Sequence, residues 1–394
     1  MRMLREKSRI LRPSMEPGRR VLVTSDIHAN LPYLQGLLKK LSFSDDDILI
    51  VDGDFLEKGK NSIGTLRHLM ELSEKKTVYT VLGNCDEWQL ALLKGSVMDE
   101  HMARYFRRRK TGLLFEMLLS LDIDPLTIEH PSAYYGELSR VYAEEFRFLS
   151  SLPHAIETEH FIFCHAGLDG SKALEENTSD ELTAREAFLR EGQTFKKWIV
   201  TGHWPCVLYG ENIVNANPII DREHRIVTLD GGCVLKDDGQ LNALILPEIG
   251  CSDPEQFRTA YYDPFPEAAV LDPQTEGKRS WYIRWGDSSV QVLQRGEEFS
   301  RCRHVRTGYE MDILTKYLFT EQEITGCNDC TDYVLPLEPG DRVGIVEETS
   351  RGYFVKHNGI SGWYAGRLER SLTPTATTVP TARTASTVLT APTV

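Results

Sequence analysis

Asp26 and His28 are separated by one residue and follow directly after the apolar run at 21–24. Side chains at positions i and i+2 of an extended segment lie on the same side of the chain. At the end of a strand, this carboxylate and this imidazole can therefore face one point. Oxygen and nitrogen ligands together suit a divalent transition metal. The pair alone is a weak signal, because many chains of this length contain an Asp-x-His sequence by chance.

Four further apolar runs end in the same way, in a polar residue that could bind a ligand. Residues 47–52 precede Gly53-Asp54, residues 77–82 precede Gly83-Asn84, residues 161–164 precede His165, and residues 198–201 precede Gly202-His203. Open α/β sheets bind ligands outside the carboxyl ends of their strands. The glycines allow a sharp turn and a close approach of the backbone to a ligand. The sequence therefore predicts an α/β fold in which five short buried strands share one site.

In this order, Asp26-x-His28, Gly53-Asp54, Gly83-Asn84, His165 and Gly202-His203 resemble the motifs of calcineurin-like metallophosphoesterases. Residues 53–59 resemble the Gly-Asp-x-x-Asp-Arg-Gly block of the phosphoprotein phosphatase branch. Residues 165–168, 202–205 and 229–232 resemble the bacterial members of that branch and the symmetrical diadenosine tetraphosphatases. The resemblance extends over roughly residues 19–248. It implies a four-layer α/β/β/α sandwich as the catalytic domain.

The resemblance also implies a hydrolase that uses two divalent metal ions and metal-activated hydroxide on phosphate esters. Asp26 and His28 would bind the first ion, Asp54 would bridge both ions, and Asn84, His165 and His203 would complete the second. Mixed oxygen and nitrogen ligation suits Mn or Fe, and Zn is a further candidate. The residues transferred as catalytic are Asp54, Asn84, Cys85 and Asp86. The alternative, ordinary turn and capping residues, does not explain six such residues in order after strands.

Cys85 stands where the family block usually has a His that protonates the leaving group or holds the phosphate. A thiol with a pKa near 8.5 is a poorer cation than an imidazolium. We therefore expect a preference for substrates with good leaving groups, or a different proton donor. The alternative is a cysteine that only packs. Pro205 stands where many phosphodiesterases of the superfamily have a second metal-binding His, which favours the phosphatase and tetraphosphatase branch.

Lys58 stands where the family has an Arg that grips phosphate. It offers a point charge without the bidentate geometry of a guanidinium, so it is either a phosphate ligand or a solvated loop lysine. Arg185, in a helix predicted over 180–190, resembles the Arg that precedes the last His block in bacterial members. It is a candidate for a second phosphate contact, and the alternative is a surface arginine. The basic run 107–110 could also meet phosphate, or form a solvated helix face.

The composition limits the partners and the cellular location. A formal net charge of −13 disfavours non-specific binding to nucleic acid or to anionic membranes. No apolar run is long enough to cross a bilayer, and residues 1–20 lack the apolar stretch of a secretion signal. The eight cysteines have no spacing typical of a disulfide framework. We therefore expect a cytoplasmic protein with reduced thiols.

The predicted domain organisation has five parts. A flexible leader covers residues 1–19, and the catalytic domain covers 20–248 with a helical insert at 86–153. Residues 251–332 form a β-rich region that resembles nothing specific. Residues 333–370 resemble a bacterial Src-homology-three-like barrel, which could bind a peptide or its own catalytic domain. Residues 371–394 form a low-complexity Thr, Ala and Pro tail that we expect to be disordered.

The predicted function is hydrolysis of phosphomonoesters, in the manner of a Ser/Thr protein phosphatase. The substrate would be a phosphorylated protein or a small phosphorylated molecule. The alternative within the enzyme class is a dinucleoside polyphosphate hydrolase of the diadenosine tetraphosphate type. The alternative from another class is a degenerate phosphatase that only binds a partner. The altered residues Cys85 and Lys58 favour this last interpretation weakly, and the complete ligand set disfavours it.

Overall fold

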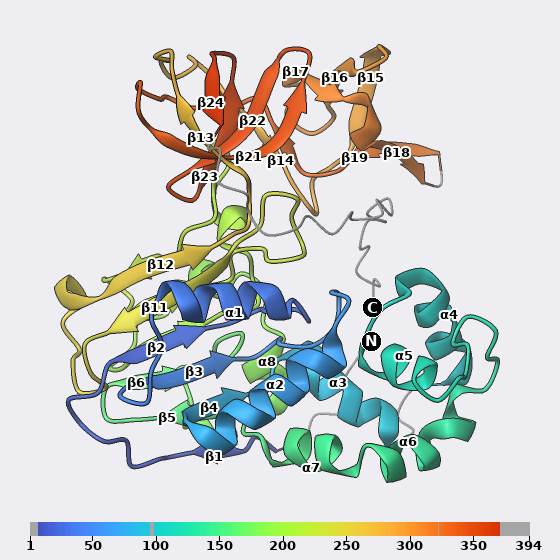
Figure 1. The fold of residues 1–394 in the computed structure, drawn as a ribbon, viewed down its shortest axis with the longest axis vertical. Coiled ribbons are helices and arrows are strands. Elements are labelled where there is room, and N and C mark those ends of the chain that lie inside the picture. The colour runs from blue at the N-terminus through green and yellow to red at the C-terminus, as the bar shows by residue number, and fades with distance from the viewer. Residues whose placement is uncertain (1–6, 95–97, 322, 371–394) are drawn as a thin grey trace.

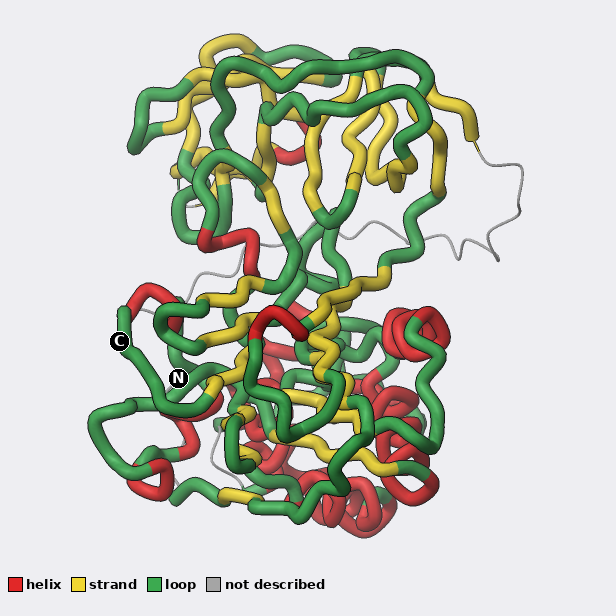
Figure 2. The backbone as a smooth tube through the Cα atoms, turned by 90° about the vertical axis from the view of Figure 1, so that its left-hand side faces the viewer, coloured by secondary structure: helices red, strands yellow, loops and turns green. Residues whose placement is uncertain are grey.

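The structure, a computed structural model, describes residues 7–94, 98–321 and 323–370. Figure 1 divides it into a layered α/β part and a β-rich part formed mainly by the C-terminal third of the chain. In Figure 2 the upper part consists almost entirely of strands and loops, whereas the lower part carries helices outside its strands. The tail predicted to be disordered, 371–394, lies outside the described residues.

The first sheet holds the strands that precede Asp26, Asp54 and Asn84. Its order is β12-β11-β2-β3-β4. The strands are β2 (Val21–Thr24), β3 (Ile48–Asp52), β4 (Thr77–Val81), β11 (Leu241–Leu246) and β12 (Arg258–Tyr262). β2, β3 and β4 are parallel, with Thr24 opposite Val51 and Asp52 opposite Val81. Their carboxyl ends therefore lie side by side.

The second sheet holds the strands that precede His165 and His203. Its order is β1-β5-β6-β7-β10-β9. The strands are β1 (Ile10–Leu11), β5 (Ala155–Glu157), β6 (Phe161–Phe163), β7 (Trp198–Thr201), β9 (Ile219–Asp221) and β10 (Ile226–Thr228). β6 and β7 are parallel, with Phe163 opposite Val200. The two histidines therefore follow neighbouring strands at the same end of this sheet.

The two sheets pack face to face, because one face of each is built from aliphatic and aromatic side chains. Val23 and Ile50 of the first sheet share a fully buried cluster with Phe163 and Val200 of the second. Burying such a side chain contributes about 1.5–3 kcal/mol each. This shared core brings the carboxyl ends of both sheets to one place, where the candidate ligands follow.

Helices cover the outer face of the first sheet. The helices are α1 (Leu31–Lys40), α2 (Ser62–Lys75), α3 (Asn84–Leu93), α4 (Asp99–Arg109), α5 (Leu113–Leu119), α6 (Tyr135–Val141), α7 (Ala143–Ser151) and α8 (Ser179–Thr183). Leu34 of α1 and Leu66 of α2 join Leu49 of β3 in one core cluster. α8 and short 3₁₀ helices line the second sheet instead. The predicted four-layer α/β/β/α arrangement is thereby confirmed.

The C-terminal part contains several antiparallel sheets. The largest has the order β24-β13-β21-β22-β23-β8. Its strands are β8 (Val214–Asn215), β13 (Glu267–Val270), β21 (Arg342–Thr349), β22 (Gly352–His357), β23 (Ile360–Tyr364) and β24 (Leu368–Arg370). Smaller sheets pair β14 (Tyr282–Ile283) with β20 (Cys330–Thr331), β15 (Val290–Gln294), β16 (Phe299–His304) and β17 (Glu310–Leu314) together, and β18 (Leu318–Glu321) with β19 (Ile324–Cys327).

Several elements cross the predicted domain boundaries. β8, from within the expected catalytic range, pairs with β23, and β13 pairs with β21 and β24. The segment 333–370 therefore completes its sheet with strands from elsewhere, and its resemblance to a Src-homology-three-like barrel stays a prediction. β12 extends the first sheet beyond residue 248. The domain limits remain a proposal, since strand pairing between distant segments leaves no local sequence signal.

Within the expected flexible leader, two of the described residues form a strand of the second sheet. Ile10 and Leu11 form β1, which pairs with Ala155 and Ile156 of β5. The guanidinium of Arg9 donates to the carbonyl of Leu152 at 2.7 and 3.1 Å. The helix predicted over 180–190 is also shorter, because α8 ends at Thr183. In the part of the chain that the structure describes, no helix has both the length and the apolar character needed to span a membrane.

Candidate metal centre

The six predicted metal ligands follow the carboxyl ends of five strands, and the loops that carry them are bonded to one another. Asp26 and His28 follow β2, Asp54 follows β3, Asn84 follows β4, His165 follows β6, and His203 follows β7. The N–H of Asp26 donates to the carbonyl of Gly53 at 3.0 Å, and that of His28 to the carbonyl of Asp54 at 2.9 Å. The first two ligand loops therefore form one hydrogen-bonded unit.

Four of the six predicted ligands have a left-handed backbone. The φ angles are 55° for Asp26, 50° for His28, 49° for Asp54 and 65° for His203. Residues with a Cβ rarely occupy this region, and such strain costs about 1–3 kcal/mol each. The surrounding structure must impose it, and strain of this kind gathers at functional sites. The loops thus aim these side chains at a cost in stability.

Two glycines permit the close approach of the loops. A Cβ on Gly83 would lie 2.2 Å from Oδ1 of Asp54, and a Cβ on Gly202 would lie 2.0 Å from Oδ2 of Asp26. Contacts under 3.0 Å do not occur between real atoms of these kinds. Glycine is therefore required at both positions for the carboxylates to reach the centre.

Asp54 is the central residue of the site. Its Oδ1 lies 3.4 Å from Nε2 of His165, and its Oδ2 lies 3.9 Å from Nε2 of His28. One ligand atom from each of Asp26, Asp54 and His165 lies within 4.8 Å of the others, and the same holds for His28, Asp54 and Cys85. Asp54 is common to both clusters. Its carboxylate is therefore the group that the two clusters share.

Neighbouring groups orient the imidazoles. Nδ1 of His165 donates to the backbone carbonyl of Asp52 at 2.8 Å, which directs Nε2 towards the centre. Nδ1 of His203 lies 2.9 Å from Oδ1 of Asn84. The side chains of Asn84 and His203, predicted to serve the same ion, are thus adjacent. The ring centroids of His165 and His203 are 5.2 Å apart.

Two of the three candidate histidine ligands are in the protonation state that binds a metal. Burial, helped by Lys58, lowers the pKa of His28 to about 3. Burial, helped by His165, lowers the pKa of His203 to about 3. Both are neutral at pH 7, the form that binds a metal. Burial also acts to lower the pKa of His165, but Asp54 and Asp26 outweigh it and raise that pKa to about 10. These carboxylates require positive charge between them.

The centre contains buried polar atoms that the described residues leave without hydrogen-bond partners. Among them are Oδ1 of Asp26, Nε2 of His165 and Oδ2 of Asp230. Burial, together with the charge of Asp230, raises the pKa of Asp26 well above its usual value. Unpaired buried carboxylates are costly unless a cation compensates them. The donor set, its burial and its excess negative charge therefore fit divalent metal ions.

Cys85 and Lys58, the two departures from the family pattern, both lie at the centre. The N–H of Cys85 donates to Oδ1 of Asp54 at 2.8 Å. Burial and the charge of Asp54 raise the pKa of its thiol well above the usual value, so the thiol is neutral at pH 7. Nζ of Lys58 lies 3.3 Å from Nε2 of His28 and 3.9 Å from Oδ2 of Asp54. Lys58 is thus beside the ligands rather than in a solvated loop.

The side chains of Asp86 and Arg185 are engaged by other protein groups. The two carboxylate oxygens of Asp86 accept hydrogen bonds from the N–H groups of Leu56, at 3.0 Å, and Gly83, at 2.9 Å. Asp86 therefore fixes the loops around Asp54. Arg185 follows the end of α8, and its Nη1 forms an ion pair with Glu191 at 2.9 Å. The cleft described below is lined by the neighbouring Glu186, not by Arg185.

Sequence reasoning did not assign Asp52 or Asp230 to the site. Both are fully buried. Burial raises the pKa of Asp52 to about 7 and that of Asp230 to about 6. Neither oxygen of the Asp52 carboxylate has a hydrogen-bond partner among the described residues. The only available signal was a carboxylate at the end of an apolar strand, which motif matching ignores.

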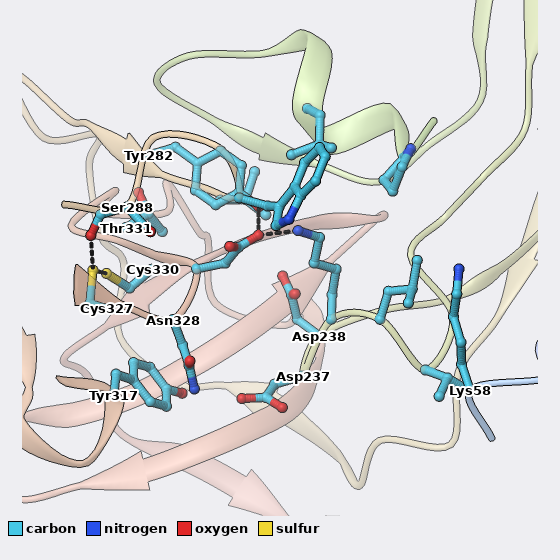
Figure 3. Close-up of a pocket in the computed structure, with 18 of the residues that line it drawn as sticks. Lys58, Asp237, Asp238, Tyr282, Ser288, Tyr317, Cys327, Asn328, Cys330 and Thr331 are labelled. Atoms are coloured by element: carbon cyan, nitrogen blue, oxygen red, sulfur yellow. Dashed lines mark hydrogen bonds and ion pairs between the residues drawn. The ribbon is translucent and has the colours of Figure 1, made fainter. Parts of the chain in front are cut away.

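A cleft of about 960 Å³ opens from this centre. Lys58, His203 and Trp204 line it on the catalytic side, and residues of the C-terminal part line the opposite side. Figure 3 shows Lys58 at one end, Tyr282 and Tyr317 at the other, and Asp237 and Asp238 between them. Three members of the basic run 107–110, Arg108 to Lys110, also line the cleft. The helix that carries them is thus turned towards the site, which the sequence left open.

Comparisons with known proteins agree with this geometry. The family profile of calcineurin-like phosphoesterases matches residues 19–232. A symmetrical bis(5'-nucleosyl)-tetraphosphatase from Glaesserella parasuis serovar 5 (strain SH0165) is 28% identical over 144 residues, covering 35% of this chain and 50% of that protein. The chain therefore spans half the length of the curated relative that it matches.

Two solved structures are similar at low identity. A protein serine/threonine phosphatase from Saccharomyces cerevisiae is 14% identical with a TM-score of 0.42, covering 66% of this chain and 84% of its own. A metallophosphoesterase from Sphaerobacter thermophilus is 16% identical with a TM-score of 0.36, covering 63% and 90%. Because the family profile covers more than half of the 394 residues and includes all six predicted ligands, the chain belongs to the calcineurin-like phosphoesterase family.

Proposed function

We propose that this protein hydrolyses phosphomonoesters at a dinuclear metal centre, in the manner of a Ser/Thr protein phosphatase. The observation that carries the proposal is the position of Asp54. Its carboxylate belongs to both clusters of metal-ligating atoms, one with Asp26 and His165 and the other with His28 and Cys85. A carboxylate shared in this way is what a two-metal phosphoesterase needs.

The residues assigned to the metals are those transferred from the family motifs. Asp26, His28 and Asp54 would hold the first ion, and Asp54, Asn84, His165 and His203 would hold the second. Oxygen and nitrogen donors favour Mn or Fe, with Zn a further candidate. When bound, two such ions supply hydroxide at neutral pH and neutralise charge on the phosphoryl oxygens.

Lys58 is the side chain that we assign to substrate binding. Burial acts to lower its pKa, but the carboxylates of Asp54 and Asp26 help to outweigh burial, and the net pKa is raised above its ordinary value. Lys58 therefore carries a full positive charge at pH 7, beside the bridging carboxylate. It would bind a non-bridging phosphate oxygen as a point charge. Cys85 stays a neutral thiol, so it supplies no positive charge to the leaving group.

Hydrolysis of a dinucleoside polyphosphate is the second candidate function. The cleft is lined by Lys58, Lys60, Arg108, Arg109 and Lys110, more cations than a single phosphate needs. The relative from Glaesserella parasuis is named a bis(5'-nucleosyl)-tetraphosphatase. Both facts support a substrate with several phosphates.

The remaining alternative is a protein that only binds a partner, including a peptide held by residues 333–370. The complete ligand set, of which Asp26, His28, Asp54 and His165 are buried, speaks against the loss of catalysis. Turnover and metal content separate this alternative from the two enzyme functions.

The test uses the full-length protein loaded with Mn. Phosphopeptides and diadenosine tetraphosphate are offered in parallel, with Asp54→Asn as the inactive control. We expect phosphate release from phosphopeptides, lost by at least 100-fold in Asp54→Asn. Preferred cleavage of the dinucleotide would instead support the second candidate. Two bound metals without turnover on either substrate would overturn the proposed function and support the binding-only alternative.

A further inference from the structure

The cleft is built by two parts of the chain, and only one of them belongs to the matched family region. The family match ends at residue 232. The opposite side of the cleft is formed by the loop 234–238 and by residues from 282 to 363, all C-terminal to that match. The half of the cleft that faces the metal centre therefore lies outside the matched family region, and its side chains bear on which substrate the cleft can hold.

The end of the cleft beside the metal centre is basic. Its lining includes Lys58, Lys60, Arg108, Arg109 and Lys110. Glu57 holds the two segments together, because its Oε1 accepts the N–H of Leu113 at 2.7 Å and its Oε2 accepts the hydroxyl of Tyr105. The corner between α4 and α5 is thereby fixed next to Lys58. One phosphate carries about two negative charges at neutral pH, so this basic end suits a chain of phosphates.

The side of the cleft that the C-terminal part forms is aromatic. Tyr282, Trp285, Tyr317, Phe354 and Trp363 line it. The indole of Trp285 packs edge to face on that of Trp204, with ring centroids 5.6 Å apart and planes at 71°. Trp204 directly follows the predicted ligand His203. Trp285 is therefore the aromatic residue of the C-terminal part that is tied most directly to the metal centre.

Hydrogen-bond acceptors accompany the aromatic residues. Oδ2 of Asp238 is buried and has no hydrogen-bond partner among the described residues. Asp329 is held in place by an ion pair with Lys236 and by the hydroxyl of Tyr282 at 2.9 Å. Figure 3 shows Asp238 between Tyr282 and Lys58. The polar groups thus change from cations near the metals to carboxylates near the aromatic rings.

We propose that the C-terminal β-rich region is the base-recognition wall of this active site, and that the cleft takes a nucleoside polyphosphate. The phosphates lie along the basic end, the base stacks on Trp285, and Asp238 accepts an N–H of the base. A volume of about 960 Å³ lies within the range of ligand pockets and accommodates such a molecule. A basic peptide would meet repulsion at the basic end. An acidic phosphopeptide would leave the carboxylates unmatched.

This inference rests on the proposed phosphoesterase function and favours its second candidate, a substrate with several phosphates, over a phosphopeptide. Its test does not depend on turnover. Two ligands are titrated calorimetrically into the full-length protein at fixed free Mn: adenosine 5'-(β,γ-methylene)triphosphate and inorganic tripolyphosphate. They share the phosphate chain and differ by the nucleoside. The ratio of their dissociation constants therefore reports the contribution of the base. We expect the nucleotide to bind about tenfold tighter, the size of one base–aromatic stacking contact.

Trp285→Ala should abolish this ratio while leaving the affinity for tripolyphosphate unchanged. Trp285→Phe should retain part of it and shows that the fold tolerates substitution there. Trp281→Ala is the matched control, because Trp281 packs on His304 and Tyr309 and does not line the cleft. Arg109→Gln should weaken both ligands equally. An unchanged ratio in Trp285→Ala would overturn the proposal, as would a phosphopeptide that alone loses affinity in this variant.

Turnover of p-nitrophenyl phosphate separates this proposal from the phosphoesterase function. This small ester has one phosphate and no base, so its hydrolysis tests the phosphoesterase function alone. If p-nitrophenyl phosphate is hydrolysed but the ratio of the two dissociation constants is unchanged in Trp285→Ala, base recognition is contradicted and the phosphoesterase function is supported. If the ratio is lost in Trp285→Ala but p-nitrophenyl phosphate is not hydrolysed, base recognition is supported and the phosphoesterase function is contradicted.

Discussion

The backbone N–H of His203 donates a hydrogen bond to Oδ2 of Asp26 over 3.0 Å, across 177 positions of the sequence. It joins the loop after β7, in the second sheet, to the loop after β2, in the first. The other oxygen of Asp26, Oδ1, lies 3.7 Å from Nε2 of His28. One oxygen of this carboxylate thus holds the two sheets together at the site, and the other remains for a cation.

Gly202→Ala should disrupt this arrangement. The added Cβ would lie 2.0 Å from Oδ2 of Asp26 and 2.5 Å from Oγ of Ser25, so the carboxylate must move. Overpacking of this kind costs about 1–3 kcal/mol. We expect at least a tenfold loss of metal affinity, measured by metal content after dialysis. Gly250→Ala is the control, since a Cβ added there would meet no atom within 4 Å. Full metal content in Gly202→Ala would show that the loops adapt.

Metal addition should stabilise the folded protein. Asp26, Asp54 and Asp230 are buried together, and a divalent cation relieves their repulsion. A ligand at 100 times its dissociation constant contributes about 2.7 kcal/mol. We expect the melting temperature to rise by several degrees on addition of Mn, with two ions bound per chain. Asp54→Asn should bind fewer ions and show a smaller rise. Equal rises in both proteins would place the metal elsewhere.

Cys85→His should change the dependence of the rate on the leaving group. Burial and Asp54 keep the present thiol protonated and uncharged. An imidazole at this position could supply a proton and a positive charge to a poor leaving group. We expect faster hydrolysis of alkyl phosphates, by about tenfold or more given the usual size of general acid effects, and little change for aryl phosphates. If Cys85→His hydrolyses alkyl phosphates and aryl phosphates at the same rates as wild type, Cys85 is a packing residue.

Glu57 should make stability depend on pH. Burial raises the pKa of Glu57 from 4.5 to about 7, although hydrogen bonds from Tyr105 and Leu113 act in the opposite direction. Between these two values the folded protein holds a proton that the unfolded chain releases. The stability linked to Glu57 is therefore fully present below pH 4.5 and is lost as the pH rises through 7. The loss is on the order of 3 kcal/mol, since one pKa unit corresponds to about 1.36 kcal/mol.

Glu57→Gln tests this linkage, because glutamine does not titrate. Urea unfolding of metal-free wild type and variant at pH 5 and pH 8 gives the comparison. We expect wild type to lose more stability than Glu57→Gln between the two values. Glu338→Gln, at an exposed loop position, controls for the loss of one charge. Parallel pH profiles for wild type and Glu57→Gln would contradict the raised pKa.

Much of the metal centre could be read from the sequence, because its signals are local. An apolar strand that ends in Asp, Asn or His, with a glycine for the turn, is visible within a few residues, as at Gly53-Asp54 and Gly202-His203. The order of five such strands carried the resemblance to the family. Both the layered α/β fold and the membership in the family followed from these patterns.

The roles of single residues depended on contacts that no local pattern encodes. Asp86 and Arg185 have the residue types that catalysis needs, yet Asp86 accepts N–H groups of two loops and Arg185 pairs with Glu191. Lys58 was undecided from sequence, and the turn after Asp54 brings its ammonium within 3.3 Å of His28. Side chain direction is set by packing and by left-handed backbone angles, which type and spacing do not reveal.

The sequence by itself determined the family, because the candidate metal ligands and the strands before them form short motifs that follow one another along the chain. Only the tertiary structure decided what else surrounds the substrate. In the structure β8 pairs with β23, and Trp285 packs on Trp204. Arg109 and Lys58 line the same cleft. These contacts join segments that lie far apart in the chain. Their energy comes from burial and pairing between distant surfaces, so they leave no periodicity or motif in the sequence.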